Sequence, residues 1–343
     1  MKLNDYLKQG KSYIIAEMSA NHGGSKERAL DIVDAAAKAG ADCLKIQTYT
    51  ADTMTLNSDK PYFQLTKGHW AGYSRYALYE EGTLPWEWQA DIKKRCEKNG
   101  IDFLSTAFDF SSVDFLESLG VECYKVASFE LTDIPLLRYI AKTGKTMIIS
   151  CGMGTKEEIS EAVAAAREEG NNNIILLKCT SEYPAKYEDM NLNLIKLMKA
   201  DFKCHVGLSD HSLGDTIAVG AVAMGAAVIE KHFCITRKDK TPDSDFSMEE
   251  QEFCEMVSNI RKLESALGNP VYQLSETETA GRINRRSLFI KSDIKKGEAI
   301  TIDNIAIVRP AHGLHPRYYY DVLGKIAVKD LEAGDPLEGN DFE

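Results

Sequence analysis

The stretch CHVGLSDHSLGDTIAVGAVAMGAAVIEKHFCI (204–235) contains the pattern that decides the fold of this chain. Two short apolar runs, CHVGLSDH (204–211) and VIEKHFCI (228–235), flank a segment rich in alanine and glycine, and each run carries polar residues near its end. Residues 217–229 are too few, and too rich in glycine and alanine, to span a bilayer, so we expect a buried helix before the second strand. A strand, a helix and a second strand predict a βαβ unit whose two strands lie parallel.

Six similar apolar runs precede this stretch, and amphipathic segments of helical period separate them. The runs are YIIAEMSA (13–20), CLKIQTY (43–49), FLSTAFD (103–109), CYKVASFE (123–130), TMIISCGM (146–153) and IILLKCTS (174–181). Eight strand–helix units in roughly 250 residues match a (β/α)8 TIM barrel, whose catalytic groups lie at the C-terminal ends of the strands. The polar residues at these ends are Glu17, Lys45, Thr106, Lys125, Glu130, Ser150, Ser181, Asp210, His211 and His232. We therefore predict an α/β fold of the TIM-barrel class and an enzymatic function.

The chain changes character after the last predicted strand. Residues 247–268 have a helical pattern, which Gly268 and Pro270 end. A polar linker follows over residues 271–284, and residues 285–343 consist of short β-like runs (SLFI, AITI, AIVR) cut by turns. We predict a catalytic TIM barrel over residues 1–270 and a small β-rich domain over 285–343. A domain of that size is at the margin of independent stability, so we expect it to pack on something.

The composition is that of an ordinary globular protein. The 343 residues are 44% hydrophobic and 27% charged, and the formal net charge is −11. This acidic balance argues against a nucleic-acid partner, because binding to phosphate backbones requires a basic face. The N-terminus lacks the apolar region of a secretory signal, and the eight cysteines form no CxxC pair. We therefore expect a cytoplasmic protein with free thiols and without a membrane partner.

Two histidines end adjacent predicted strands, His211 in GLSDH and His232 in IEKHF. Neighbouring strands lie about 4.8 Å apart, so both imidazoles can reach one divalent metal ion on the barrel axis. Two histidine ligands leave several positions for water and substrate, which is typical of a catalytic metal site. The alternative is that one of them is a hydrogen-bonded core histidine. We favour the metal site because the two histidines share adjacent strand ends.

Lysines and hydroxyl groups gather at the same strand ends. Lys45, Lys125 and Lys178 are expected to project from the second, fourth and sixth strands into the barrel mouth. A buried lysine is costly unless an anion compensates it, so these lysines predict an anionic substrate. Hydroxyl groups close to helix N-termini would add donors for a phosphate or carboxylate, from Ser128, Ser150, Ser181 and Ser209. Each serine alone could be a helix N-cap, but four around one rim favour an anion site.

Two carboxylates, Glu17 and Glu130, complete the predicted site. They could perform acid–base chemistry or bind hydroxyl groups, and each alone could instead pair with a neighbouring lysine. A metal, lysines, hydroxyl groups and carboxylates together predict chemistry on a phosphorylated substrate with a metal-held carbonyl.

The segment from Thr50 to Trp86 is too long for a simple connection. Its aromatic content disfavours disorder, and the residues concerned are Tyr62, Phe63, Trp70, Tyr73, Tyr76 and Tyr79. We expect a lid or a binding loop, and the alternative is a surface loop packed by its own aromatic side chains. Trp86 and Trp88 are expected to begin the helix that follows.

Motifs along the whole chain resemble the sialic acid synthase family. They are IAEMSANHGG, KIQTY, STAFD, YKVASFE, KCTSEYP, GLSDH, IEKHF and PDSDFSM. The tail, with NRRSLFIKSDIKKGEAIT and RPAHGLHP, resembles that family's antifreeze-like (SAF) domain. Within the family, SANHGGS, QTYTADTMTLNSDK, LYEEGTLPWEW and GLHPRYYYDVLGK are most similar to the pseudaminate-forming subfamily.

This resemblance implies a reaction, a cofactor and an assembly. The family condenses phosphoenolpyruvate with an N-acetylated amino sugar, releasing phosphate and forming a nine-carbon 2-keto acid. In the subfamily the sugar is 2,4-diacetamido-2,4,6-trideoxy-L-altrose. The implied cofactor is Mn²⁺, with Mg²⁺ or Co²⁺ as alternatives, held by His211 and His232 to polarise the sugar aldehyde for attack by C3 of phosphoenolpyruvate. The implied assembly is a domain-swapped homodimer.

The resemblance also implies a role for each site residue. The catalytic residues would be Glu17, Lys125, His211 and His232. Phosphoenolpyruvate would be bound by Lys45, Thr106, Lys125, Ser128, Ser150, Ser181 and Ser209. The sugar would be bound by Gln47, Glu130, Tyr183, Asp243 and Arg309. The swapped SAF domain of one subunit would insert its Arg309 over the sugar in the other.

The chain departs from the family's pattern at a few positions. It has Ser181 where Asn is frequent and Cys151 where Thr is frequent, which bears on anion affinity. Ala311 and His312 stand in a stretch that is more commonly RPGxG, which bears on the sugar contacts of the tail.

Three other functions are compatible with these residues. One is the same reaction on another sugar, as in an N-acetylneuraminate or legionaminate synthase. Another is a Schiff-base aldolase with Lys178 or Lys125 as the nucleophile, which borohydride would trap with substrate and which a chelator would not inhibit. The last is a non-catalytic sugar-binding module, which would bind sugar without releasing phosphate.

Overall fold

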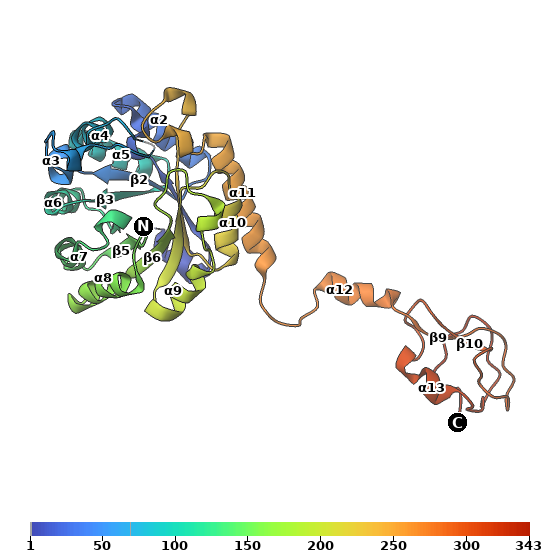
Figure 1. The fold of residues 1–343 in the computed structure, drawn as a ribbon. Coiled ribbons are helices and arrows are strands. Elements are labelled where there is room, and N and C mark those ends of the chain that lie inside the picture. Colours follow the sequence, from blue (N-terminus) through green and yellow to red (C-terminus); the bar gives the residue numbers. More distant parts are fainter. Residues whose placement is uncertain (1, 69) are drawn as a thin grey trace. The chain divides into compact units, whose positions relative to one another are not determined.

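Eight parallel strands close into a barrel in chain order, with β8 pairing back to β1 (Figure 1). The computed structural model describes residues 2–68 and 70–343. The strands are β1 (Tyr13–Glu17), β2 (Cys43–Thr48), β3 (Asp102–Ala107), β4 (Cys123–Val126), β5 (Thr146–Ser150), β6 (Ile174–Cys179), β7 (His205–Asp210) and β8 (Val228–His232). Nearly all of every strand falls within one of the predicted apolar runs. The predicted (β/α)8 barrel is therefore confirmed.

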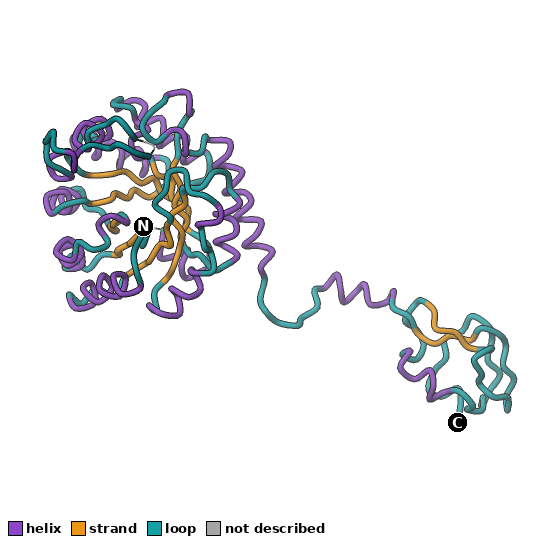
Figure 2. The backbone as a smooth tube through the Cα atoms, in the orientation of Figure 1, coloured by secondary structure: helices purple, strands orange, loops and turns teal. Residues whose placement is uncertain are grey.

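Helices surround the barrel and alternate with its strands (Figures 1 and 2). They are α1 (Leu3–Gln9), α2 (Lys26–Lys38), α3 (Ala51–Met54), α4 (Arg75–Gly82), α5 (Trp86–Lys98), α6 (Phe110–Ser118), α7 (Ile134–Ala141), α8 (Lys156–Glu168), α9 (Leu194–Phe202), α10 (Thr216–Ala223) and α11 (Glu250–Leu267). Side-chain oxygens of Ser25, Asp109 and Thr155 accept backbone N–H groups at the starts of α2, α6 and α8. Gly268 ends α11, as its sequence predicts.

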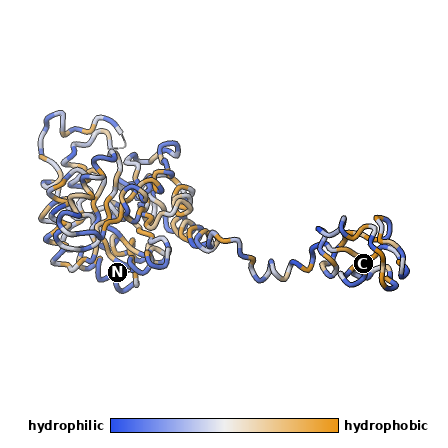
Figure 3. Tube along the Cα trace, turned by 90° about the horizontal axis from the view of Figure 1, so that it is seen from below, coloured by the Kyte–Doolittle hydropathy of each residue, from blue (hydrophilic) through white to orange (hydrophobic). Residues whose placement is uncertain are grey.

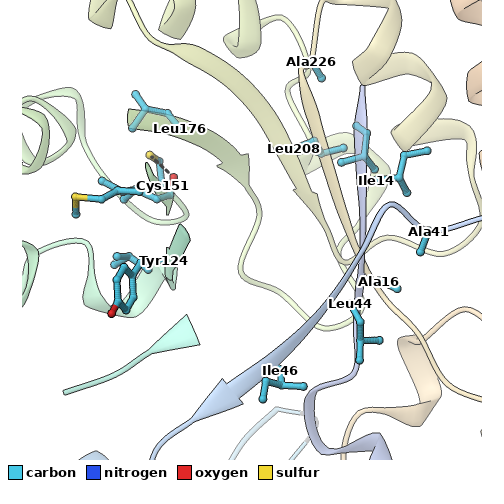
Figure 4. Packing of buried hydrophobic residues seen from close by; sticks show 14 of the residues in the cluster. Ile14, Ala16, Ala41, Leu44, Ile46, Tyr124, Cys151, Leu176, Leu208 and Ala226 are labelled. Atoms are coloured by element: carbon cyan, nitrogen blue, oxygen red, sulfur yellow. Dashed lines mark hydrogen bonds between the residues drawn. The ribbon is translucent and has the colours of Figure 1, made fainter. Parts of the chain in front are cut away.

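Successive residues of each strand face opposite sides of the barrel wall. One set packs outward against the helices in a large apolar cluster, whose members include Ile14, Leu44 and Leu208 (Figure 4). The alternate set fills the barrel interior and includes Tyr13, Ile15, Cys43, Leu104, Cys123, Ile148, Ile175, Leu177 and Val228. Helix α1, which the sequence did not predict, adds Leu3 to this second cluster and covers the end at which the strands begin. The opposite end of the barrel is therefore left for polar groups.

The chain divides into two units, Met1–Gly268 and Asn269–Glu343. Part of the segment predicted as a linker is helical, as α12 (Glu276–Gly281). In the second unit β9 (Ser287–Ile290) pairs antiparallel with β10 (Ile305–Val308), and α13 (Tyr319–Val322) lies later in the chain. Of the predicted β-like runs, AITI (299–302) forms no strand, and its Ala299 makes an isolated bridge with Ile326. A core of its own, which includes Leu288, Ile300 and Leu337, holds this unit together.

Hydrophilic stretches lie mostly on the outer turns of each unit, and hydrophobic stretches run through their interiors (Figure 3). Within residues 2–68 and 70–343, no helix combines the length and the apolarity needed to cross a bilayer.

Candidate active site

Polar side chains replace the apolar interior at the end of the barrel where the strands finish. They occupy the same alternate positions as the inward apolar residues, two or four residues further along most strands, and are Glu17, Lys45, Gln47, Thr106, Lys125, Ser150, Ser209, Glu230 and His232. Strand pairing brings neighbours together, because Glu17 is the register partner of both Lys45 and His232. Apart from half-buried Gln47, these side chains are buried. The sequence prediction that these strand ends form one cluster is consistent with this geometry.

Two lysines and two glutamates form the centre of this cluster. Lys45 Nζ lies 2.7 Å from Glu17 Oε2 and 3.6 Å from Glu230 Oε1. Lys125 Nζ lies 3.9 Å from the same Glu230 oxygen, which also accepts a 3.3 Å hydrogen bond from Ser209. Opposite charges at these distances offset part of the large cost of burying each one. Glu230 was not among the predicted site residues, although it lies two residues before His232 and therefore on the same face of β8.

Burial and neighbouring charges shift the pKa values of three of these groups from their ordinary values. Burial raises the pKa of Glu17, although Lys45 opposes this effect. Burial also disfavours the charged form of Glu230, but Lys125 and Lys45 together lower its pKa below the ordinary value. Burial lowers the pKa of Lys125, against the attraction of Glu230. Glu17 is therefore the carboxylate of this cluster that more readily takes up a proton.

Hydroxyl groups surround the two ammonium groups. Lys45 Nζ donates to Thr106 Oγ1 at 3.1 Å, and Lys125 Nζ donates to Ser150 Oγ at 2.7 Å. Gln47 Nε2 donates to Glu17 Oε1 at 2.9 Å and so holds this carboxylate in place. The lysines thus keep a polar shell that suits an anionic ligand.

The side chains of two of the four predicted serines, Ser128 after β4 and Ser181 after β6, lie close to Gly152 after β5. Ser128 Oγ accepts the Gly152 N–H at 3.0 Å. A Cβ atom at Gly152 would lie 2.2 Å from Ser181 Oγ and 2.7 Å from Ser128 Oγ, so only glycine fits there. The prediction that all four serines lie close to helix N-termini is wrong for Ser150, Ser181 and Ser209. Ser181 lies in the loop after β6, six residues before the next helical turn at Tyr187. Ser150 and Ser209 belong to strands and point into the barrel, and Thr155 caps the helix after β5 instead.

The two histidines lie side by side at the ends of the adjacent strands β7 and β8. Their ring centroids are 5.4 Å apart, and both side chains are buried. His211 Nδ1 donates to the Thr180 carbonyl at 2.9 Å, which leaves its Nε2 available. Among the described residues, His232 Nδ1 has no hydrogen-bond partner. Burial and neighbouring positive charges, such as that of Lys45, lower the pKa of His232 well below its ordinary value, so this ring stays neutral.

This pair fits a divalent metal ion. Imidazole ligands bind such ions through a neutral nitrogen at about 2.1 Å, and the ring spacing is compatible with two ligands of one ion. Within the described part of the chain, no group of three or more His, Cys, Asp or Glu side chains could hold a metal. The protein would therefore supply two ligands, and water and substrate would complete the coordination.

Aromatic side chains cover the histidine pair. The Tyr183 ring lies 4.2 Å from that of His211, and the Phe246 ring lies 5.0 Å from that of His232. Trp70, from the segment between β2 and α5, lies 5.3 Å from Tyr183. That segment is not one long loop, because α3 and α4 interrupt it, but Trp70 does bring it to the site. Trp86 begins α5, as predicted.

Three further predicted sugar-binding residues lie outside this ring of strand ends. Glu130 follows β4, and burial raises its pKa to about 7. Its Oε2 atom is buried and has no hydrogen-bond partner within residues 2–68 and 70–343. Asp243 follows β8 and accepts the Ala20 N–H at 3.2 Å. Arg309 belongs to the second unit, and its role over the sugar stays a prediction.

Two residues predicted at the strand ends face away from the barrel mouth. Lys178 alternates with the inward residues Leu177 and Cys179 and donates to Thr180 Oγ1. Asp210 pairs with Lys231 on the helix-facing side of the wall. The prediction that Lys178 projects into the mouth is therefore wrong, because the alternation along β6 gives the inward position to Cys179. Lys178 is thereby removed as a candidate Schiff-base nucleophile.

Comparison with known proteins agrees with this geometry. The NeuB family model matches residues 32–272, and the SAF domain model matches residues 285–343. The chain is 46% identical, over the full length of both, to a pseudaminic acid synthase of Campylobacter jejuni subsp. jejuni. It is 38% identical to an N,N'-diacetyllegionaminic acid synthase of C. jejuni subsp. jejuni, over 94% of this chain and 97% of that protein.

A solved structure supports the same relationship. The crystal structure of an N-acetylneuraminic acid (sialic acid) synthetase from Leptospira borgpetersenii matches with a TM-score of 0.71 and 31% identity, covering 79% of this chain and 90% of that one. The resemblance to the sialic acid synthases that the motifs predict is thus confirmed along both parts of the chain. The chain belongs to the NeuB family.

Proposed function

We propose that this chain condenses phosphoenolpyruvate with 2,4-diacetamido-2,4,6-trideoxy-L-altrose and water to give pseudaminate and phosphate. The observation that carries the proposal is the joint burial of Lys45, Lys125 and the histidine pair in one barrel mouth, in a chain 46% identical over its length to a pseudaminic acid synthase. The lower identity to the legionaminate relative, 38%, ranks that alternative second.

The donor site would consist of Lys45, Lys125 and their hydroxyl neighbours. Phosphoenolpyruvate carries a phosphate and a carboxylate, and two ammonium groups with surrounding Ser and Thr hydroxyls can bind both. Glu17 and Glu230 balance the lysines before the donor arrives, at the distances given above. The donor's negative charge would then compete with Glu230 for both ammonium groups.

The acceptor site would lie beside the histidine pair and the aromatic side chains that pack against it. Bound at His211 and His232, Mn²⁺ (or Mg²⁺ or Co²⁺) supplies Lewis-acid chemistry at the sugar aldehyde. Tyr183 would contact the sugar ring. The polar groups of the sugar would form hydrogen bonds with Glu130, Gln47 and Asp243. Apolar surface from Trp70 suits a sugar with a 6-methyl and two acetamido methyl groups.

Glu17 would transfer protons to or from the reacting groups. The new bond joins C3 of the donor to the aldehyde carbon, whose oxygen must gain a proton, while the water added at C2 of the donor must lose one. Glu17 lies beside His232 in the strand register, so it is close to the acceptor side, and its raised pKa suits a group that exchanges a proton.

The assembly and the compartment belong to the same proposal. The protein would work in the cytoplasm as a domain-swapped homodimer, with Arg309 of each SAF domain covering the sugar in the other subunit's barrel. An arginine there would exclude water and bind acceptor oxygens.

A phosphate-release screen tests the reaction. The full chain is incubated with phosphoenolpyruvate, Mn²⁺ and a panel of acceptors: the trideoxy-altrose derivative, the legionaminate precursor and N-acetylmannosamine. We expect release to be fastest with the altrose derivative. Faster release with another member of the panel would reassign the sugar. Sugar binding without any phosphate release would favour the binding-module alternative, and borohydride trapping of Lys125 would favour the aldolase.

Metal removal and loss of either histidine should have the same consequence. Chelation should abolish turnover, and Mn²⁺ or Co²⁺ should restore it. His211→Ala and His232→Ala should each remain folded by circular dichroism yet lose most activity, because no third protein ligand among the described residues can replace them. His205→Ala, at the exposed start of β7, is the matched control and should retain activity. Near-parental rates in either site variant would identify that residue as a core histidine.

Removal of the charge of Lys45 or Lys125 should weaken the binding of phosphoenolpyruvate rather than that of the sugar. Lys45→Met and Lys125→Met keep the apolar stem and remove an ammonium group whose charged hydrogen bonds contribute about 1.5–3 kcal/mol. The KM for phosphoenolpyruvate should rise about tenfold to hundredfold, and kcat/KM should depend less on ionic strength. Lys178→Met, on the other face of the wall, should leave both unchanged. An effect limited to the sugar KM would contradict the assignment.

Mixed dimers test the swapped arrangement. Arg309→Ala and His211→Ala are each expected to be nearly inactive. After subunit exchange, the heterodimer should regain some activity, because one of its sites combines an intact barrel with an intact partner tail. If heterodimers are confirmed by mass and no activity returns, each tail serves its own barrel.

A further inference from the structure

A buried ion pair lies directly behind the two histidines. Asp210 and Lys231 are register partners on β7 and β8, and each immediately precedes one histidine, His211 or His232. Lys231 Nζ lies 2.7 Å from Asp210 Oδ2, and both side chains are almost fully buried. The pair therefore joins the two strand ends from the helix-facing side, opposite to the side on which the histidines lie.

Ser212 extends this pair around His211. Lys231 Nζ also donates to the Ser212 carbonyl at 2.6 Å. Asp210 Oδ1 accepts from the Ser212 N–H at 2.9 Å and from its hydroxyl at 2.7 Å. The residues on both sides of His211 are thus bonded to each other and to the residue that precedes His232. We call Asp210, Ser212 and Lys231 the histidine clamp.

The stability of the barrel does not explain this clamp. Other outward positions on the same strands are filled by aliphatic residues of the main apolar cluster, such as Leu208 (Figure 4) and Ile229. A buried ion pair is often no more stabilising than apolar side chains of similar volume, because desolvation offsets the attraction. Unlike two aliphatic residues, the pair makes directional hydrogen bonds, and these hold both backbones in a single arrangement.

We propose that Asp210 and Lys231 are positioning residues that set the spacing of His211 and His232 and thereby their affinity for a divalent cation. The inference rests on the metal role given to the histidine pair in the proposed function. With only two protein ligands, the affinity depends strongly on how rigidly those two are held. Loss of groups that orient metal ligands commonly weakens binding about tenfold to hundredfold.

The test compares Mn²⁺ binding in matched variants of the full chain. The double variant Asp210→Asn/Lys231→Met removes both charges together, so no charge is left buried alone, and Asn can still accept from Ser212. Metal-free protein is titrated with Mn²⁺, and free Mn²⁺ is measured by electron paramagnetic resonance, alongside the Tm of the metal-free protein. We expect the Kd to rise about tenfold or more.

A second ion pair provides the control. Arg261 Nη2 lies 2.8 Å from Asp42 Oδ2 in a partly buried pair that makes no contact with the histidines. Asp42 also accepts a hydrogen bond from the Ile14 N–H. Asp42→Asn/Arg261→Met should lower the Tm without changing the Mn²⁺ Kd. An equal rise in Kd in this control would show that lower stability alone weakens Mn²⁺ binding, and it would overturn the proposal.

A milder variant covers the case in which the double variant does not fold. Ser212→Ala removes one hydroxyl hydrogen bond to Asp210 and leaves the ion pair, so the Kd should rise about two- to tenfold. Parental Mn²⁺ affinity in the folded variants would overturn the clamp alone. Absence of Mn²⁺ binding to the parent chain, or binding that His232→Ala does not weaken, would overturn the metal site of the proposed function and the clamp with it.

Discussion

Closure of the barrel is the constraint on which the rest of this structure depends. In a closed parallel sheet every strand residue faces either the barrel interior or the surrounding helices, and the two directions alternate. Residues two apart therefore share a side. The interior changes from Ile15 to Glu17 and from Val228 to Glu230 and His232 within two or four residues. Because of this alternation, apolar side chains fill the barrel where the strands begin, and charged side chains meet where the strands end.

The burial of these charges is costly, and their arrangement explains how the fold tolerates it. Lys45 and Lys125 each lie within 4 Å of a carboxylate and donate to a hydroxyl group, so neither of these two ammonium groups is buried without partners. The resulting cluster carries as many negative as positive side chains. An anionic donor can enter it by displacing carboxylates from lysines that already point inward, so little reorganisation is required.

Local patterns in the sequence were sufficient to predict the eight strands, the helix that ends at Gly268 and most of the strand-end residues. These succeed because apolar periodicity and terminating glycines act over a few residues. The errors have a common cause. Residue type alone places Lys178 in the mouth and does not single out Glu230, because only the alternation along a strand separates inward from outward positions. Residue type also does not separate strand-end or loop serines such as Ser150, Ser181 and Ser209 from helix N-caps, because element boundaries predicted from sequence are uncertain by a few residues.

The sequence by itself determined the class of fold, the family and the chemical groups available, because these depend on residue types and their spacing along the chain. Only the tertiary structure decided which groups meet. The contact of Glu230 with both lysines, the approach of Trp70 to Tyr183 and the clamp of Asp210 on Lys231 each join residues far apart in sequence. Such contacts follow from the order of strands around the barrel and from their register, which are set by the packing of the whole sheet rather than by any single segment.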